Sequence, residues 1–356
     1  MQVTSLQTLG WHERWQEPFA PYAERYTLGR VSLEHKHMYR VMTEEGDLLG
    51  EVSGKLRHEA SGREDYPAVG DFVLLEARAS EGKATIHGIL PRFSKFSRKA
   101  AGNTTEEQIV ASNVDTVFLV NALNNDFNLR RIERYLILAW ESGASPVIVL
   151  SKADLCEEAT ERAAEVEAVA IGVPVHVVSA WNQEGIEALT PYVSPGRTVA
   201  LLGSSGAGKS TLINLLLGEP VQEVQGIREG DDRGRHTTTY RELFVMPGGG
   251  LLVDTPGMRE LQLWHADEGL GDTFAEIEEL AAGCKFADCR HEREPGCAVR
   301  EGLLGGALRA ERYESYKKTQ RELAFLAAKD DVKLRLQQKE RWKKLTSSNR
   351  NRVNRK

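Results

Sequence analysis

The sequence of 356 residues contains no apolar run approaching the ~18–20 residues that a membrane-spanning helix needs. Its first ten residues lack a basic stretch followed by an apolar one, so no secretory signal is visible. Cysteine is scarce, with four in the whole chain, and three of these fall within residues 284–297. In a reducing compartment such clustering favours a metal site over disulfides, and the isolated Cys156 is expected to be a small packing residue. Together these absences predict a cytoplasmic protein.

The chain also lacks a net positive charge, but its charges are unevenly distributed. The formal net charge is −6. Residues 312–356 contain 15 Lys and Arg against 5 Asp and Glu, a balance of +10 that leaves −16 for the residues before them. An acidic body with a basic tail indicates an anionic partner for the tail alone, although a solvated helix with a frayed end would also fit. The length suggests two or three domains.

A glycine-rich segment at residues 203–210 reads G-S-S-G-A-G-K-S and matches the G-x-x-x-x-G-K-[ST] pattern without interruption. The apolar run before it, residues 198–202, is typical of a buried parallel strand, and the run after it, residues 211–217, predicts a helix. This is the context of a P-loop, in which backbone N–H groups surround phosphate oxygens. Lys209 is then expected to reach the β- and γ-phosphates and the Ser210 hydroxyl to hold Mg²⁺. The alternative, a chance glycine-rich turn, is disfavoured by both flanking elements.

Two further segments are expected at the same phosphate site. The D-x-x-G sequence at residues 254–257 leaves an apolar strand, so Asp254 would orient Mg²⁺ and the Gly257 N–H would contact the γ-phosphate. Residues 226–240 are rich in Gly, Arg and Asp without an apolar period, which is typical of a mobile loop. A threonine near its end, which we assign as Thr238, would complete the Mg²⁺ shell only when the γ-phosphate is present. Either segment alone could be an ordinary loop.

A weaker motif indicates which base is bound. Residues 151–154 (S-K-A-D) and the pair Ser179 and Ala180 each follow a predicted strand, and they resemble the N-K-x-D and S-A elements of GTPases. In that family the aspartate, here Asp154, accepts hydrogen bonds from the N1–H and the exocyclic amine of guanine and so selects GTP. Ser151 stands in the Asn position. Its hydroxyl can replace only some of the amide contacts, which predicts a modest nucleotide affinity.

The first third of the chain has a different pattern. Between residues 30 and 99, short strand-like runs alternate with turn signals, which predicts a small β-barrel of the five-stranded OB type. Its basic and aromatic exit, residues 92–99, suits contacts with an RNA backbone and stacking on bases, although a purely structural barrel would also fit. From about residue 113 onward strands alternate with helices, which predicts βαβ units and a parallel sheet.

The C-terminal third contains the three clustered cysteines and a histidine. Cys284, Cys289, His291 and Cys297 offer three thiolates and one imidazole, a complete tetrahedral set for one structural Zn²⁺. Because no ligand position is left open, catalysis by the zinc is not expected. Its role would be to fold a segment that has too little core of its own.

The order of these motifs along the chain is unusual. The base-reading motif comes first, followed by the P-loop, the threonine switch and D-x-x-G, whereas Ras-like GTPases begin with the P-loop. The chain therefore resembles a circularly permuted GTPase, and permutation is tolerated when the original termini lie close together. With a barrel ahead of the motifs and a Cys/His cluster behind them, it resembles the small ribosomal subunit biogenesis GTPase family, RsgA, from about residue 30 to about residue 320. This resemblance implies a late-acting assembly factor whose GTP hydrolysis is stimulated by the small subunit.

One catalytic group of Ras-type GTPases is missing from its usual position. Met258 stands where those enzymes have the glutamine that orients the attacking water. His236, beside the switch threonines, is the nearest substitute, and the family resemblance supports it. A histidine that only contacts phosphate or rRNA is the alternative. An RNA-binding protein that uses nucleotide as a conformational ligand without turnover is the second functional interpretation, and a P-loop ATPase or kinase is disfavoured by Asp154.

The whole sequence thus predicts a multi-domain α/β chain. Residues 1–35 are expected to form an N-terminal extension, residues 36–108 the OB-like barrel, residues 109–268 the circularly permuted GTPase domain, and residues 269–356 a zinc-binding domain with a basic helical tail. The expected GTP-binding residues are Ser151, Lys152, Asp154, Ser179, Ala180, Gly203, Ser204, Ser205, Gly206, Ala207, Gly208, Lys209, Ser210, Thr211, Asp254 and Gly257. The expected Mg²⁺ ligands are Ser210, Thr238 and Asp254, and the expected catalytic residues are His236, Lys209 and Thr238. The expected partners are GTP or GDP and the small ribosomal subunit with its rRNA, without a membrane, for a monomeric protein.

Overall fold

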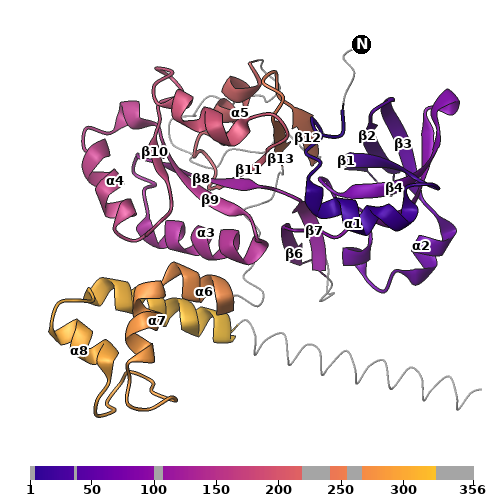
Figure 1. Cartoon of the computed structure of the whole chain (residues 1–356). Coiled ribbons are helices and arrows are strands. Elements are labelled where there is room, and N and C mark those ends of the chain that lie inside the picture. The colour runs from indigo at the N-terminus through magenta and orange to yellow at the C-terminus, as the bar shows by residue number, and fades with distance from the viewer. Residues whose placement is uncertain (1–4, 36–37, 100–106, 219–240, 255–266, 326–356) are drawn as a thin grey trace, which may run out of the picture. The chain divides into compact units, whose positions relative to one another are not determined.

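The computed structural model describes residues 5–35, 38–99, 107–218, 241–254 and 267–325 (Figure 1). Contacts divide the chain into two units, residues 1–98 with 107–262 and residues 99–106 with 263–356. The first unit contains a barrel and the sheet that carries the glycine-rich loop. The second unit contains the Cys/His cluster.

Five strands close into a barrel in the first part of the chain. They are β1 (Thr27–His35), β2 (Met38–Thr43), β3 (Gly46–Val52), β4 (Phe72–Arg78) and β5 (Lys83–Ile89). β1 pairs antiparallel with β2 and β4, β2 with β3, and β4 with β5, while β3 and β5 run parallel. The ring of pairings is closed, which confirms the OB-like barrel. β1, however, begins inside the residues expected to form an N-terminal extension, so the barrel includes residues before 36.

The barrel core follows from alternation along the strands. In β2 and β3, Tyr39, Val41, Leu48 and Val52 are buried while their neighbours are more exposed. With Val31, Val73, Leu75, Ala84 and Ile86 they form one apolar cluster. The connections around the barrel contain α2 (Gly54–Glu59), η3 (Arg63–Asp65) and η4 (Ala79–Glu81), and a two-stranded sheet of β6 (Lys95–Lys99) and β7 (Glu107–Ser112) follows.

The residues before β1 pack on the barrel. They form η1 (Glu13–Trp15), α1 (Gln16–Phe19) and η2 (Ala20–Tyr22). Trp15 is almost fully buried, packs against Phe72 with ring centroids 4.7 Å apart, and donates a hydrogen bond from its Nε1 to the Pro91 carbonyl at 2.8 Å. This segment therefore completes the apolar core at one end of the barrel.

A buried arginine connects this segment to the rest of the first unit. The guanidinium of Arg30 donates to the carbonyl oxygens of Leu9, Gly70 and Asn113 at 2.6, 3.1 and 2.9 Å. Its side chain is fully buried, and burial lowers the pKa of Arg30 to about 10. The hydrogen bonds keep this buried cation satisfied while they join the N-terminal segment, the barrel and the start of the next sheet.

The basic exit of the barrel does not present the RNA-stacking surface expected from the sequence. Phe96 is buried at 2% exposure. Arg92 donates two hydrogen bonds to the fully buried carboxylate of Asp71, at 2.8 and 2.7 Å, and two more to carbonyl oxygens. Lys95 forms an ion pair with Glu107 at 3.0 Å. Arg92 is thus already paired within the barrel, and Lys95 is paired across the two-stranded sheet of β6 and β7.

A second sheet continues from the barrel. Its strands are β8 (Thr116–Ala122), β9 (Ser145–Ser151), β10 (Val175–Val177), β11 (Thr198–Gly203), β12 (Glu242–Val245) and β13 (Leu251–Asp254), in the order β10-β9-β8-β11-β13-β12. All of them run parallel except β12, which is antiparallel to β13 and also pairs with β1 of the barrel, at Leu33 and Glu242. The Arg40 side chain of β2 forms an ion pair with the same Glu242 at 2.8 Å. One hydrogen-bonded ladder thus extends through both parts.

Helices cover both faces of the parallel strands, as expected for βαβ units. They are α3 (Leu129–Ser142), α4 (Ala159–Glu167) and α5 (Lys209–Leu217), with short turns η5 (Ala153–Leu155) and η6 (Ile186–Val193). α5 lies on one side of the sheet and α3 on the other (Figure 1). Leu212, Ile213 and Leu217 of α5 pack with Phe118 and Leu201 of the sheet in one buried cluster. The α/β architecture predicted for this part is confirmed.

The second unit is helical in its described part. Its elements are α6 (Asp267–Thr273), α7 (Ala275–Ala282) and α8 (Ala298–Leu304), followed by a helix over residues 310–325. The last helix packs on the first two: Arg312 donates to the Thr273 carbonyl, and Tyr316 contacts Phe274 with ring centroids 5.4 Å apart. The buried Phe274 and Tyr316 belong to a small core. Among the helices of the described chain, none combines the length and apolarity that crossing a membrane requires.

Candidate functional site

The chemistry-bearing motifs of the first unit meet at one edge of the parallel sheet. Ser151, the last residue of β9, is paired with Ala122 at the end of β8, and Gly203 at the end of β11 is paired with Val120. β13, which ends at Asp254, runs parallel to β11 on its other side. Because the carboxyl ends of parallel strands share an edge, the base-reading motif, the P-loop and Asp254 leave the sheet together, where open α/β sheets bind ligands.

The glycines of the P-loop are required by its geometry. A Cβ atom at Gly203 would lie 2.3 Å from the Val120 carbonyl oxygen, so only glycine fits beside β8. Gly206 and Gly208 have φ angles of 73° and 86°, in the left-handed region that glycine adopts without strain. α5 begins directly afterwards at Lys209, so the amide groups of its first turn face the loop.

The side chain of Lys209 lies over the loop that it follows. Its Nζ donates hydrogen bonds to the carbonyl oxygens of Gly203 and Ser204 at 2.8 and 2.6 Å. These two hydrogen bonds hold the ammonium group over the loop, where it could donate to the phosphate oxygens of a bound nucleotide. Ser205, Ser210 and Thr211 lie in the same loop and first helical turn. Their individual roles stay predictions.

Ser151 joins the base-reading strand to the P-loop. Its hydroxyl donates to the Ala207 carbonyl oxygen at 2.6 Å and lies 3.4 Å from the Asn121 carbonyl oxygen. Ser151 and Ala207 are both buried. The residue that departs from the N-K-x-D pattern therefore still forms a direct contact between the two motifs.

Asp154 is held by the second base-reading element. The Ser179 hydroxyl, which is fully buried, donates to Asp154 Oδ1 at 2.6 Å. The same hydroxyl oxygen accepts a hydrogen bond from the Asn182 backbone N–H at 3.1 Å. Lys152 adopts a left-handed conformation with φ = 59°, which turns the chain sharply between the strand end and Asp154. The structure thus brings together Ser151, Asp154 and Ser179, with Ala180 directly after.

One contact at this edge was not predicted from the sequence. Asp126, in the connection between β8 and α3, accepts a hydrogen bond from the Ser204 hydroxyl of the P-loop at 2.8 Å. Its two carboxylate oxygens also accept from Arg131 at 2.5 and 2.9 Å. The hydrogen bonds from Arg131 lower the pKa of Asp126, assisted by the one from Ser204 and opposed by burial. In the sequence, only its position shortly after the apolar run of β8 could have indicated that Asp126 lies at this edge.

Three predicted residues fall outside the described part of the chain. They are His236, Thr238 and Gly257. Asp254 is described, as the last residue of β13, and is half-buried. Of the predicted Mg²⁺ ligands, the structure describes Ser210 in the first turn of α5 and Asp254 at the end of β13, whereas the predicted water-orienting group lies outside the described residues.

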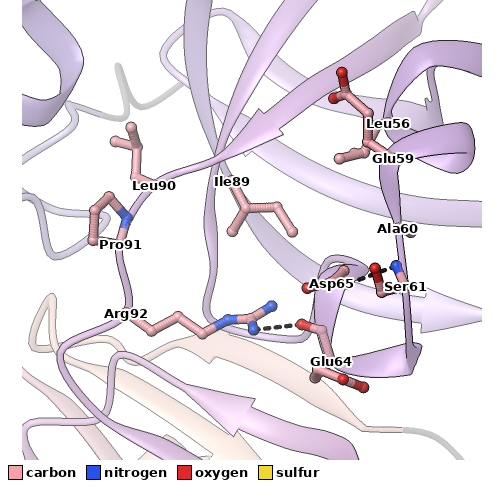
Figure 2. Close-up of a pocket in the computed structure, with 10 residues that line it drawn as sticks. All are labelled: Leu56, Glu59, Ala60, Ser61, Glu64, Asp65, Ile89, Leu90, Pro91 and Arg92. Carbon is pink, nitrogen blue, oxygen red and sulfur yellow. Dashed lines mark hydrogen bonds between the residues drawn. The ribbon is translucent and has the colours of Figure 1, made fainter.

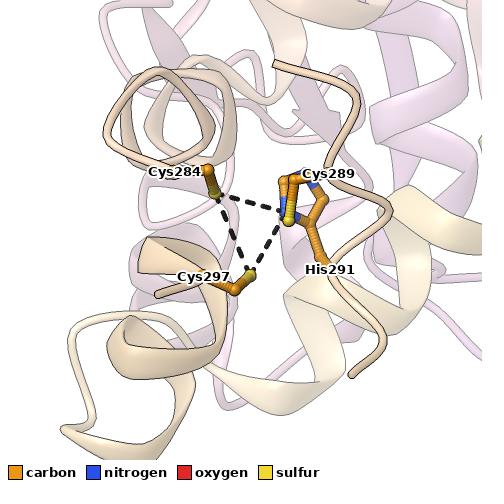
Figure 3. A group of neighbouring side chains, drawn as sticks. All are labelled: Cys284, Cys289, His291 and Cys297. Atoms are coloured by element: carbon orange, nitrogen blue, oxygen red, sulfur yellow. Dashed lines mark hydrogen bonds between the residues drawn. The ribbon is translucent and has the colours of Figure 1, made fainter. Parts of the chain in front are cut away.

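The four predicted metal ligands lie together in the second unit (Figure 3). The ligand atoms of Cys284, Cys289, His291 and Cys297 all lie within 4.8 Å of one another. Cys284 Sγ is 3.9 Å from Cys297 Sγ and 3.6 Å from His291 Nδ1, and that nitrogen is 3.4 Å from Cys297 Sγ. Zn–S bonds of ~2.3 Å and Zn–N bonds of ~2.0 Å at tetrahedral angles require edges of about 3.8 and 3.5 Å. The three edges among Cys284, His291 and Cys297 therefore match those of a tetrahedral ion site, and Cys289 lies within reach of the same ion.

The surrounding backbone supports the ligands. α8 begins after Cys297, and although burial opposes ionisation, the N–H groups of Val299 and Ala298 at its start lower the pKa of the Cys284 thiol. Burial lowers the pKa of His291, which favours the neutral imidazole that a metal requires. The Tyr313 hydroxyl donates to the His291 carbonyl at 3.3 Å. These groups fit a metal ion with soft ligands.

A separate pocket of about 580 Å³ lies on the barrel, where α2 and η3 face the end of β5 (Figure 2). Apolar residues such as Leu56 and Ile89 line it together with the carboxylates of Glu59 and Asp65. No residue of the base-reading motif or the P-loop contributes to it. This pocket therefore lies outside the candidate nucleotide site.

Comparisons with known proteins agree with this geometry. The family model described as RsgA GTPase matches residues 89–264. The small ribosomal subunit biogenesis GTPase RsgA of Opitutus terrae is 48% identical over 97% of this chain and 97% of its own length. A protein named small ribosomal subunit biogenesis GTPase RsgA 1, from Oceanobacillus iheyensis, is 49% identical over 90% of this chain and 91% of its own.

Two solved structures share the fold. YjeQ from Thermotoga maritima superposes with a TM-score of 0.65 and 30% identity over 84% of this chain and 98% of its own. YloQ, described as a circularly permuted GTPase, superposes with a TM-score of 0.63 and 26% identity over 85% of this chain and 96% of its own. The order of motifs in this chain, with β9 before the P-loop of β11, is the permuted order. Since full-length identity and motif geometry agree, the chain belongs to the RsgA family of circularly permuted GTPases.

Proposed function

We propose that this chain binds GTP with Mg²⁺, hydrolyses it to GDP and phosphate, and acts in late maturation of the small ribosomal subunit. One observation carries the proposal: the Ser151 hydroxyl of the base-reading motif contacts the P-loop carbonyl of Ala207 at 2.6 Å, with Asp154 three residues further along. A base held by Asp154 and phosphates held by the loop would then belong to one nucleotide. The names of the relatives support the subunit as partner.

The described residues divide the binding task between base and phosphates. The Asp154 carboxylate, oriented by Ser179, accepts hydrogen bonds from the N1–H and exocyclic amine of guanine. Adenine lacks this pair of donors, which supports GTP over ATP. Backbone N–H groups of residues 204–210 surround the phosphates, and the Lys209 ammonium exchanges its carbonyl partners for phosphate oxygens.

The reaction is in-line attack of water on the γ-phosphorus. A new P–O bond forms to the water oxygen, the bond to the β–γ bridging oxygen breaks, and GDP leaves. Ser210 and Asp254, with Thr238, would hold Mg²⁺, which would neutralise charge on the phosphates. The Gly257 N–H would contact the γ-phosphate, and Lys209 would stabilise the charge that develops on the transferred group.

The residue that activates water is proposed to be His236. Met258 has no group that can orient water, so hydrolysis by the chain alone should be slow. Stimulation by the small subunit would follow if contact with the subunit places His236 beside the attacking water. A chain that binds nucleotide without turnover remains the competing interpretation because of Met258.

We further propose that the Cys/His cluster holds one structural Zn²⁺. Three thiolates and an imidazole are soft and intermediate ligands that select zinc over magnesium or calcium, and four ligands leave no open position for a substrate. The basic residues of the C-terminal segment, together with the surface of the barrel outside residues 92–99, are the proposed rRNA contacts. The protein is proposed to act as a cytoplasmic monomer.

The proposal is tested by GTP turnover measured with purified ribosomal subunits. The full chain alone should hydrolyse GTP slowly, small subunits should accelerate turnover at least tenfold, and large subunits at the same concentration should not. Lys209→Ala is the control that should abolish turnover in every mixture. Tight GTP binding without turnover in any mixture would contradict hydrolysis and favour the purely conformational role.

A further inference from the structure

An exposed tryptophan follows the second base-reading element directly. Trp181 comes after Ser179 and Ala180, and 87% of its surface is exposed, the largest fraction among the exposed large hydrophobic side chains of the described residues. A second exposed apolar side chain, Leu155 at 61%, comes directly after Asp154. Asp154 and Ser179 are themselves hydrogen-bonded at 2.6 Å. Two exposed apolar side chains thus directly follow the residues that form the proposed base-reading pair, Asp154 and Ser179.

The loop that carries Trp181 is held in place rather than free. Ser179 and Glu184 exchange two backbone hydrogen bonds, each 3.0 Å long, which closes the loop between them. The Ser179 hydroxyl accepts from the Asn182 N–H inside the loop while it donates to Asp154. At the far end a Cβ atom on Gly185 would lie 2.3 Å from the Val177 carbonyl, so this backbone packs tightly on β10. A single hydroxyl therefore fixes both the carboxylate and the tryptophan loop.

We propose that the Trp181 indole stacks on the face of the guanine whose edge Asp154 reads. This inference rests on the proposed GTP binding at the same site. A carboxylate that accepts from N1–H and the exocyclic amine lies in the plane of the base, so it leaves the faces of the ring uncovered. An aromatic side chain within the same fixed loop covers such a face, and stacking removes apolar surface of both rings from water.

Contact with rRNA is the other use of an exposed indole, since unpaired bases also stack on aromatic side chains. The structure favours the nucleotide because the loop is fixed through the hydroxyl that orients Asp154. A residue that only served a distant RNA strand would not need this shared anchor. The two uses differ in what they predict for isolated protein.

Stacking predicts a loss of affinity without a loss of selectivity. Every base has a π-face, so a stacking side chain binds guanine and hypoxanthine equally, whereas Asp154 distinguishes them by the exocyclic amine. Trp181→Ala should raise the Kd for GDP and for IDP by the same factor, roughly tenfold, since base–aromatic stacking is worth about 1.4 kcal/mol or more. Trp181→Phe should remain within about threefold of the unaltered chain, because the phenyl ring still stacks.

The experiment is calorimetric titration of the full chain with GDP and with IDP, which avoids hydrolysis. The matched control is Ile171→Ala, which truncates another exposed apolar side chain, 69% exposed, in the connection between α4 and β10, whereas Ser179 follows the other end of β10. Its Kd should not change. Nucleotide addition should also change tryptophan fluorescence in the unaltered chain, and that change should shrink in Trp181→Phe.

Three results would overturn the inference. The first is an unchanged GDP affinity in Trp181→Ala, and the second is a changed ratio of GDP to IDP affinity, which would assign the side chain to the base edge. The third is a Trp181→Ala variant that binds nucleotide normally but binds small subunits more weakly than the unaltered chain, which would assign the indole to rRNA. Failure of the unaltered chain to bind GDP at all would instead refute the proposed function.

Discussion

The Ser179 hydroxyl lies 2.6 Å from the Asp154 carboxylate, although the two residues belong to different βα connections. Ser179 is fully buried and its hydroxyl oxygen also accepts a hydrogen bond from the Asn182 N–H, so the carboxylate is oriented before any nucleotide binds. Preorganisation of this kind lowers the ordering cost of binding. Ser179 is therefore a positioning residue for base recognition.

Replacing Ser179 by Ala should weaken GDP binding roughly tenfold, because a hydrogen bond to a charged group contributes about 1.5 kcal/mol or more. The Kd is measured by calorimetry on the full chain, and thermal unfolding checks that the fold is retained. Ser61→Ala, at an exposed serine of the barrel, is the matched control. Equal GDP affinities for the two variants would show that Asp154 needs no support from Ser179.

The contact between Ser151 and the P-loop makes a second prediction. Ser151→Ala removes the hydroxyl that donates to the Ala207 carbonyl and leaves a buried acceptor unpaired, which costs about 1–3 kcal/mol. Affinity for GDP and thermal stability should both fall. Ser145→Ala, at the exposed first residue of the same strand, should change neither. If Ser151→Ala binds GDP normally, the link between base-reading strand and loop has no energetic role.

The pairing of Asp126 with Arg131 predicts a dependence on acidity. The pKa of Asp126 is lowered, so the folded chain holds this carboxylate ionised more strongly than the unfolded chain does. The stability that it contributes is present at neutral pH and is lost as pH falls below about 3.8 through the lowered folded-state pKa.

Urea unfolding of the unaltered chain and of Asp126→Asn should therefore differ at pH 7 and converge towards pH 3. Asp47→Asn, at an exposed position near the start of β3, serves as the control. A difference that persists undiminished at the lowest pH would show that the effect comes from packing and not from the charge.

Removal of a thiolate from the cluster should release the metal. Cys289→Ser should reduce bound zinc from one equivalent to nearly none, and the second unit should unfold at lower temperature, because metal binding contributes directly to the stability of a small loop-rich segment. Elemental analysis and calorimetric unfolding measure the two effects. Cys156→Ser, which alters a cysteine outside the cluster, should keep full zinc content. Full zinc content in Cys289→Ser would refute the assignment.

His236→Ala tests the proposed water-orienting group. We expect the turnover stimulated by small subunits to fall 100-fold or more, in the range that general acid–base groups contribute, about 10²–10⁴-fold. GTP affinity should change little because the base and P-loop contacts are retained. Stimulated turnover that stays at the level of the unaltered chain would remove His236 from the mechanism.

The sequence predicts the P-loop and the Cys/His cluster because each is built from residues close together in the chain. The P-loop has fixed spacing because one turn of backbone must surround phosphates, and the cluster at residues 284–297 has four ligands within a short segment. Asp126 has no such spacing. It contacts Ser204 only through the pairing of β8 with β11, which sequence periodicity does not reveal.

The predicted boundary at residue 36 left β1 outside the barrel, although strand-like runs were expected from residue 30. Residues 30–34 alternate polar and apolar side chains, which is typical of a strand with one exposed face, yet Arg30 and Ser32 are fully buried. Arg30 is buried because three carbonyl oxygens satisfy its guanidinium, and those carbonyls come together only in the folded chain. The exit at residues 92–99 was interpreted as an RNA surface because composition cannot show that Arg92 is already paired with Asp71.

The shared ladder between β1 and β12 has a mechanical consequence. Residues 226–240, the loop that the sequence assigns to sensing the γ-phosphate, are covalently joined to β12 through Arg241, and β12 is fastened to the barrel at Leu33 and Arg40. If the barrel rotates relative to the parallel sheet, β12 must either lose its pairing with β1 or β13 or move together with Arg241, to which the loop is attached. A partner that binds the barrel and rotates it would therefore also move the point at which the predicted γ-phosphate loop is attached.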